Sequence, residues 1–225
     1  MADRVVLITG AKGGLGSFVT QRFLQTSATV VGVALNISQN DFPASNFLAL
    51  PADVTNPAAV NRMTDSILEQ YHRLDVLVHV VGAFAGGKSV AETDDSTWKQ
   101  MQELNLTSAF YVLRATIPHL RKSGSGRIVA IGSLAAAEPH PGLGAYVTFK
   151  SALVSLVRTV ALENKDARLT ANIVLPGTMD TPANRKAMPS ADSSKWLQPA
   201  DVADLVLWLT DERAAHITGT AIPID

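Results

Sequence analysis

Short apolar runs alternate with longer amphipathic segments along this sequence. Seven runs have the pattern of strands, at 4–9, 28–35, 46–54, 75–81, 126–133, 169–176 and 220–224. Five segments with helical spacing lie between them, at 15–27, 57–73, 96–122, 145–164 and 199–211. Strands that are apolar on both faces need cover on both faces, which is typical of a parallel sheet between helices. We therefore predict an α/β fold, a single doubly wound domain over 1–225 with a mostly parallel seven-stranded sheet flanked by helices.

Two segments depart from this regular pattern. The helix at 96–122 contains Pro118, which can bend it. The segment 178–198 is rich in Pro, Ser and Asp and follows the strand at 169–176. A long loop in that place can cover a binding site, so we predict a substrate lid at 178–198.

Composition narrows the functions that such a fold can have. Hydrophobic residues make up 47% of the 225 residues and charged ones 17%, which predicts a large core and little disorder. The formal net charge is −1 and no basic run occurs, which argues against nucleic-acid and membrane partners. The chain has no cysteine, and its first apolar run is too short for a signal peptide or a membrane span. We predict a cytoplasmic protein.

The stretch "TGAKGGLG", Thr9 to Gly16, lies between the first strand and the first helix. The backbone N–H groups of such a turn and the positive end of the helix point toward an anion. Gly10 permits the tight turn, Gly14 the close approach of a pyrophosphate, and Gly16 the close packing of helix on strand. A Gly-Lys-Ser/Thr ending is missing, which argues against a P-loop nucleotidase. The loop predicts a Rossmann-type dinucleotide site.

Further motifs, in order and spacing, resemble those of the short-chain dehydrogenase/reductase family over nearly the whole chain. They are "ADV" at 52–54, "LDVLVHVVG" at 74–82, "LNLTSAF" at 104–110, "IVAIGS" at 128–133, the pair Tyr146 and Lys150, "LPGTMDT" at 175–181 and "ITG" at 217–219. The resemblance implies an NAD(P)-dependent oxidoreductase. Such an enzyme transfers hydride between nicotinamide and a small carbonyl or alcohol, or a related C=N compound.

Carbonyl reduction explains why Tyr146 and Lys150 stand four residues apart, on one face of a helix. Hydride arrival leaves negative charge on the oxygen, which must receive a proton. A phenol titrates near pH 10, and a cation about 4–6 Å away lowers that pKa. We therefore predict Tyr146 as the general acid/base and Lys150 as the cation that tunes it. Alone, such a pair is more often an ordinary surface pair.

The resemblance adds two residues to the predicted catalytic set. Ser133 would polarise the substrate oxygen, and Asn105 would support a proton relay that reaches Lys150. Lys150 would also bind the nicotinamide ribose. Taken singly, Ser133 is more often a strand-end hydroxyl than a catalytic group, and Asn105 is more often a helix irregularity.

The predicted cofactor-binding set spreads over the whole chain. It comprises Thr9, Gly10, Lys12, Gly14, Leu15, Gly16, Asp53, Val54, Gly82, Tyr146, Lys150, Pro176, Gly177 and Thr181. By resemblance Asp53 contacts the adenine, although it can also cap the turn that follows it. The five histidines show no metal-ligand spacing, so no metal is predicted.

Two positions depart from the family pattern. His79 stands in "HVVG" where the family often has Asn-Asn-Ala-Gly. Ala34 stands near the end of the second strand, where an acid usually binds the adenosine ribose of NAD. Without that acid a 2′-phosphate meets no repulsion, and Lys12 can approach it, which favours NADP. Asn36 can serve either cofactor, so the choice between NAD and NADP stays open.

Alternatives remain for the substrate and the class of function. The stretches 82–100 and 180–196 resemble the dihydropteridine reductase branch of the family, which implies pterin reduction. That branch lacks the serine found here at Ser133, so we prefer a carbonyl or alcohol substrate. A dinucleotide-sensing regulatory protein is the alternative from another class. Helices 96–122 and 145–164 are predicted to join copies into a homodimer or homotetramer, because the second is apolar around much of its circumference.

Overall fold

The computed structural model describes residues 4–225 and contains one seven-stranded sheet. The strands are β1 (Val5–Thr9), β2 (Thr29–Ala34), β3 (Phe47–Pro51), β4 (Val76–His79), β5 (Arg127–Ile131), β6 (Thr170–Pro176) and β7 (Ala221–Ile224). Their order is β3-β2-β1-β4-β5-β6-β7, and each neighbouring pair is parallel. The predicted doubly wound α/β fold is confirmed, with a sheet that is parallel throughout the described residues.

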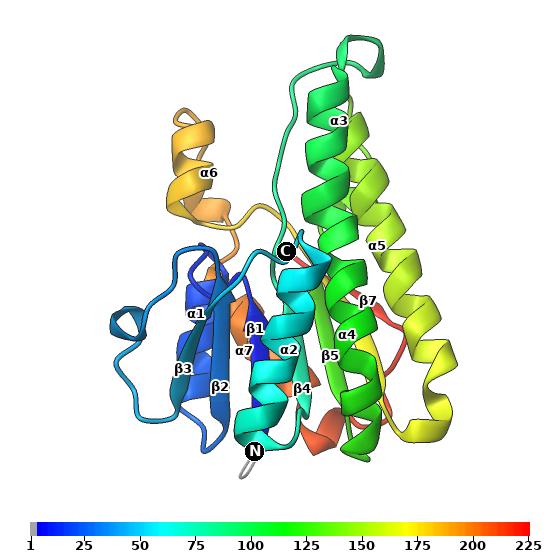
Figure 1. Ribbon diagram of the computed structural model, residues 1–225. Helices are drawn as coiled ribbons and strands as arrows, with labels where there is room; N and C mark the ends of the chain where they lie inside the picture. The colour runs from blue at the N-terminus through cyan, green and yellow to red at the C-terminus, as the bar shows by residue number, and fades with distance from the viewer. Residues whose placement is uncertain (1–3) are drawn as a thin grey trace.

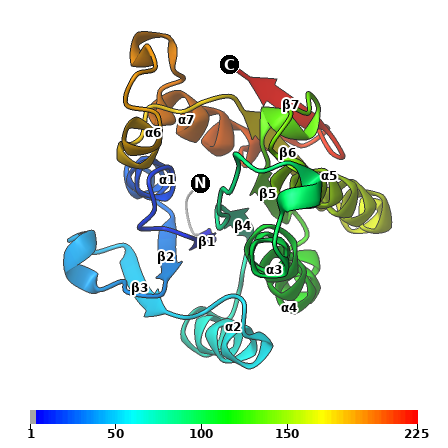
Figure 2. The ribbon, with the colours of Figure 1, turned by 90° about the horizontal axis from the view of Figure 1, so that it is seen from above.

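Helices cover both faces of this sheet (Figures 1 and 2). One face carries α1 (Gly16–Leu24) and α7 (Pro199–Leu209). The other carries α2 (Pro57–Tyr71), α4 (Ser108–Lys122) and α5 (Gly144–Glu163). Two short helices, α3 (Asp95–Gln102) and α6 (Pro182–Ala187), stand above the carboxyl edge of the sheet in Figure 1. The helices α3 and α6 therefore border the carboxyl edge, in addition to the helices that cover the two faces of the sheet.

The core forms two layers because successive strand residues point to opposite faces. Leu7 and Leu77 pack in the layer beneath α2, α4 and α5, and Ile8 and Val78 pack in the layer beneath α1 and α7. All four side chains are fully buried. Each such burial contributes roughly 1.5–3 kcal/mol, so the two layers hold the sheet edge rigidly in place.

The predicted helix 96–122 is interrupted, and the interruption lies at Asn105 rather than at Pro118. A π-helical turn, η3 (Glu103–Thr107), separates α3 from α4, and Pro118 lies inside α4. Asn105 is fully buried, and its amide Nδ2 donates to the Ala83 carbonyl at 3.0 Å. Its Oδ1 accepts from the Ala83 N–H at 3.1 Å. This pairing with a distant loop fixes the side chain, and the widened turn is typical of functional sites.

Helix α5 has the length and composition of a membrane-spanning segment, but it packs on the sheet. Leu153 and Val157 on this helix are fully buried in the layer that also holds Leu77. It is a core helix of the fold, which explains why it is apolar around much of its circumference.

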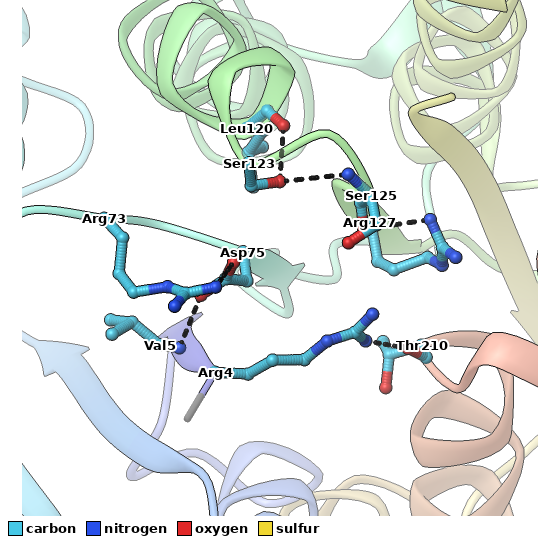
Figure 3. A network of polar contacts seen from close by, with 9 residues as sticks. All are labelled: Arg4, Val5, Arg73, Asp75, Leu120, Ser123, Ser125, Arg127 and Thr210. Atoms are coloured by element: carbon cyan, nitrogen blue, oxygen red, sulfur yellow. Dashed lines mark hydrogen bonds and ion pairs between the residues drawn. The ribbon is translucent and has the colours of Figure 1, made fainter. Parts of the chain in front are cut away.

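Charged groups close the amino edge of the sheet (Figure 3). Asp75 is 1% exposed and accepts from the Val5 N–H and from Arg73 Nε, both at 2.8 Å. Arg4 Nη1 donates to the Thr210 carbonyl at 2.7 Å. These bonds tie the start of β1 to the start of β4 and to the end of α7.

Candidate active site at the carboxyl edge of the sheet

Two glycines of the predicted dinucleotide loop stand where no side chain fits. Gly10 has a φ of +73°, and a Cβ there would lie 3.1 Å from the backbone nitrogen of Val81. A Cβ at Gly16 would collide with the carbonyl oxygen of Gly10. The loop therefore turns tightly after β1, close to the backbone that follows β4, and folds back on itself before α1 begins.

The start of α1 has the properties of an anion site. Leu15 precedes the helix and provides no side-chain cap, and the first turn holds no acidic residue. A Cβ at Gly14 would meet the side chain of Thr181 at 3.3 Å, so this face of the loop looks toward the start of α6. Free N–H groups at a helix start suit a phosphate, so the loop fits the pyrophosphate of a dinucleotide.

Lys12, which the sequence analysis expects to approach a 2′-phosphate, is engaged by an ion pair. Its Nζ lies 2.7 Å from Asp41 Oδ1 and donates to the Asn36 carbonyl at 3.0 Å. Asp41 lies in η1 (Gln39–Asp41), seven residues beyond Ala34, where sequence reasoning looked for an acid. The hydrogen bond from Lys12 lowers the pKa of Asp41, so this carboxyl is ionised at neutral pH. Only the path of the loop after β2 brings the two side chains together, so no local pattern signals it.

Asp53 and Val54 follow β3 and play different structural parts. Asp53 is exposed, and its Oδ1 accepts from Thr55 N at 2.9 Å and from Thr55 Oγ1 at 2.7 Å. This is the turn-capping role that the sequence left open. Val54 is buried in the core, so only its backbone faces the edge of the sheet.

Pro176 and Gly177 end the sixth strand beside the last residue of the chain. Pro176 is the final residue of β6, and Gly177 N donates to the Ile224 carbonyl at 2.9 Å. A Cβ at Gly177 would collide with the carboxylate of Asp225. Gly177 thus brings the end of β6 close to the Asp225 side chain.

Three predicted site residues converge at Gly82. A Cβ on Gly82 would lie 2.9 Å from Lys150 Nζ and 2.9 Å from Asn105 Oδ1. Lys150 is buried, and its Nζ donates to the Ile131 carbonyl at 3.0 Å. Burial lowers the pKa of this lysine to about 8, which leaves it charged at neutral pH but within reach of titration. Asn105, Gly82 and Lys150 thus form one polar cluster, drawn from η3, the β4 loop and α5.

Tyr146 lies beside Ser133 next to this cluster. Burial raises the pKa of Tyr146, and the nearby Ser133 hydroxyl partly offsets that rise. Lys150 Nζ lies 6.0 Å from the centre of the tyrosine ring. The expected lowering of the tyrosine pKa by Lys150 is not found, because desolvation is the larger influence on the phenol.

His79 lies beneath the cluster at the end of β4. It is 1% exposed, and its Nδ1 is 2.9 Å from Thr9 Oγ1, the residue before Gly10. Its Nε2 is buried without a partner among residues 4–225. Burial, with a smaller contribution from Lys150, lowers the pKa of His79 to about 3, so the ring is neutral. His79 joins the glycine loop to the fourth strand.

The two ends of the segment predicted as a lid, 178–198, are bonded to each other. Met179 pairs with Leu197 as an isolated parallel bridge, and Asp180 N donates to the Leu197 carbonyl at 2.8 Å. Arg185 in α6 binds Asp180 with two bonds, at 2.6 and 2.8 Å. Thr181 caps α6 by accepting from Asn184 N at 3.2 Å.

One aromatic residue beside Tyr146, Phe84, was not among the site residues predicted from the sequence. Phe84 is 62% exposed and meets Tyr146 edge to face, with ring centres 5.1 Å apart. Nearby lies a cavity of about 270 Å³, lined by Val90, Thr93, Asp95, Trp98 and Ala145. Ala145 is adjacent to Tyr146 in the chain, so the cavity adjoins the tyrosine. An exposed aromatic in a glycine-rich loop has no periodic signal, which explains the omission.

Comparisons with known proteins agree with this geometry. Residues 4–192 match the family described as short chain dehydrogenase. The chain is 31% identical to 2,5-dichloro-2,5-cyclohexadiene-1,4-diol dehydrogenase LinX of Sphingobium indicum, over 100% of this chain and 96% of that protein.

Solved structures that resemble the chain include proteins bound to either nicotinamide cofactor. A 3-ketoacyl-(acyl-carrier-protein) reductase from Brucella melitensis complexed with NADH has a TM-score of 0.90 at 25% identity, covering 100% of this chain and 97% of that one. ElxO with NADP bound has a TM-score of 0.93 at 27% identity, covering 99% and 97%. These comparisons give the pteridine-reductase resemblance no specific support. The chain belongs to the short-chain dehydrogenase family and is an NAD(P)-dependent oxidoreductase that acts on small molecules.

Proposed function

We propose that the chain transfers hydride between nicotinamide and the carbonyl or alcohol carbon of a small molecule, with Tyr146 as general acid/base. The observation that carries the proposal is the cluster at the carboxyl edge. There Tyr146 lies beside Ser133, and Lys150 and Asn105 meet at Gly82. In a doubly wound sheet, ligands bind beyond this edge.

The cofactor would be held by the loop and edge residues already described. The backbone of Gly14, Leu15 and Gly16 would bind the pyrophosphate, and Asp53 and Val54 would border the adenine. Gly82, Pro176, Gly177 and Thr181 would border the nicotinamide half. When bound, NAD(P) supplies or accepts the hydride.

The protein residues would manage the proton and the charge on oxygen. In reduction, the Tyr146 hydroxyl gives its proton to the carbonyl oxygen while hydride reaches the carbonyl carbon, and oxidation reverses both transfers. Ser133 donates a hydrogen bond to the same oxygen. Lys150 provides positive charge behind the phenol, and Asn105 holds the loop at Ala83 that borders this lysine. No metal enters this scheme.

The substrate would have an apolar body. Phe84, Val90, Trp98 and Met188 are large apolar side chains that stay exposed around the carboxyl edge. Ligand pockets are lined mainly by apolar and aromatic side chains, so these four residues would line the substrate site. Residues 178–198, with α6, would act as the lid, because Thr181 at its start faces Gly14.

The oligomeric state is also part of the proposal. Phe110 on α4 and Leu162 on α5 are exposed. Arg114 lies over the rings of Phe110 and Tyr111, at 5.0 and 5.3 Å. These two helices would join copies of the chain into a homodimer or homotetramer in the cytoplasm. A monomeric mass in solution at micromolar concentration would contradict this.

A cofactor and substrate survey tests the proposed function. Purified protein is mixed with NADH or NADPH and a panel of apolar ketones and aldehydes, and loss of the reduced nicotinamide is followed by absorbance. We expect turnover that requires the Tyr146 hydroxyl. Tight cofactor binding with no turnover, unchanged in Tyr146→Phe, would instead identify a dinucleotide sensor.

A further inference from the structure

We propose that Asp41 determines cofactor choice by holding Lys12, so that the chain favours NAD(H) over NADP(H). The inference rests on the proposed function only in requiring that a dinucleotide binds at the glycine loop. The Asp41 carboxylate lies beyond the end of β2, outside the strand-end position at which an acid was expected.

The contacts place Asp41 at the adenosine end of the site. Lys12 belongs to the glycine loop, and its Nζ reaches across to the Asn36 carbonyl, two residues beyond the end of β2. The adenosine ribose of a dinucleotide binds beside the end of this strand. The Lys12 ammonium is therefore the cation nearest to a 2′-phosphate there, and its charge is engaged by Asp41 at 2.7 Å.

Asp41 is held in position by more than Lys12. The Ser38 N–H donates to Asp41 Oδ2 at 2.8 Å, and the Ser38 hydroxyl donates to the same oxygen at 3.2 Å. Its side chain is 22% exposed, against 48% for Lys12. The carboxylate is thus the more buried member of the pair and has partners of its own, whereas the lysine is half exposed.

Electrostatics then separates the two cofactors. A 2′-phosphate carries close to two negative charges and must take Lys12 from Asp41 while lying near that carboxylate. An NAD(H) ribose brings two neutral hydroxyls, which a carboxylate can accept as hydrogen-bond donors. Asp41 thus opposes the phosphate through charge and leaves the unphosphorylated ribose unopposed. This reverses the expectation that the alanine at Ala34 favours NADP.

The test is a direct binding titration of NADH and NADPH, followed by nicotinamide fluorescence, which needs no substrate. In Asp41→Asn we expect NADPH to bind about tenfold more tightly, while the NADH affinity changes by less than about threefold. In Asp41→Asn/Lys12→Gln we expect most of that gain to disappear, because the freed lysine is its source. The ion pair is partly exposed and contributes little to stability, so these variants should fold.

A matched control removes one negative charge elsewhere. Asp166→Asn breaks the exposed pair with Arg121 (2.7 Å) and should leave both affinities unchanged. Equal changes for NADH and NADPH in Asp41→Asn, or none, would overturn the role of Asp41 while the proposed function stands. Failure of the native chain to bind either cofactor would overturn both.

Discussion

The two edges of the sheet each bury a cation, and the two cations are held differently. Arg127 at the amino edge is 3% exposed, and its Nη1 donates to the carbonyls of Ser125, Gly126 and Arg168 at 2.9, 3.0 and 3.3 Å. Lys150 at the carboxyl edge is 4% exposed, and the described residues give its Nζ one acceptor, at Ile131.

Burial lowers the pKa of both side chains, with opposite consequences. Arginine stays protonated throughout the physiological range, so Arg127 permanently binds carbonyls of two backbone segments, at Ser125 and Gly126 and at Arg168. Lys150, with a pKa of about 8, can exchange its proton, and Gly82 leaves the space in front of it free of side-chain atoms. Burial of a charged side chain therefore does not by itself identify a functional site. A buried charge that has few hydrogen-bond acceptors, with a glycine beside it, does.

Removing the tyrosine hydroxyl should have the largest effect on the carboxyl edge. We expect Tyr146→Phe to lower kcat about a thousandfold, since general acid–base catalysis contributes roughly 10²- to 10⁴-fold. Cofactor affinity, measured by titration, should stay within about threefold of the native value. Tyr71→Phe removes a hydroxyl near the amino edge, one that accepts a bond from Gln70, and should leave kcat unchanged. Substantial turnover in Tyr146→Phe would remove this tyrosine from the mechanism.

Replacing each buried cation by methionine should affect stability at the amino edge and kcat at the carboxyl edge. We expect Arg127→Met to lower the free energy of unfolding by about 2–3 kcal/mol, because three carbonyls lose a charged donor, while kcat per folded molecule is kept. Lys150→Met should lower kcat at least about a hundredfold and change stability by less than about 1 kcal/mol, since it also removes a poorly solvated charge. Urea unfolding and steady-state kinetics measure both quantities. A similar stability loss in the two variants would erase the distinction.

Residues of the candidate active site show how much of the structure could be predicted from the sequence. The seven strands and the helix that places Tyr146 and Lys150 one turn apart follow from local periodicity and were predicted. An irregularity of the helix at Asn105 was anticipated, but its π-helical form was not, because it depends on bonds to Ala83, more than twenty residues away. The neighbour of Lys12 and the raised pKa of Tyr146 likewise depend on the paths of loops, and a loop path has no periodic signal.

Adding a methyl group to a glycine at each edge gives a smaller contrast. Gly82→Ala would place a methyl 2.9 Å from Lys150 Nζ, so we expect kcat to fall about 10- to 100-fold as the ammonium is displaced. Gly124 near the amino edge has a φ of +72° and open space around its would-be Cβ. Gly124→Ala should cost about 1–2 kcal/mol of stability and leave kcat unchanged. Full activity in Gly82→Ala would show that the cluster tolerates displacement.

The pH dependence of stability tests the desolvation of Lys150. Lys150 has a folded pKa of about 8 against an ordinary value of 10.5, so between these values the unfolded chain binds more protons. Stability therefore rises with pH across this window through Lys150 and gains nothing from it below about pH 8. We expect the unfolding free energy of the native chain, minus that of Lys150→Met, to increase from pH 8 to about 10. A difference that is flat or falls would mean that Lys150 is not desolvated.

The most direct test of the central claim follows the hydride itself. The protein is given nicotinamide deuterated at its transferring position together with a ketone that it turns over, and the product alcohol is examined by mass spectrometry. The site predicts one deuterium on the carbinol carbon of the product from the native chain, and almost no labelled product from Tyr146→Phe in the same time. Product without deuterium, or equal labelling by the two proteins, would contradict hydride transfer with Tyr146 as the proton donor.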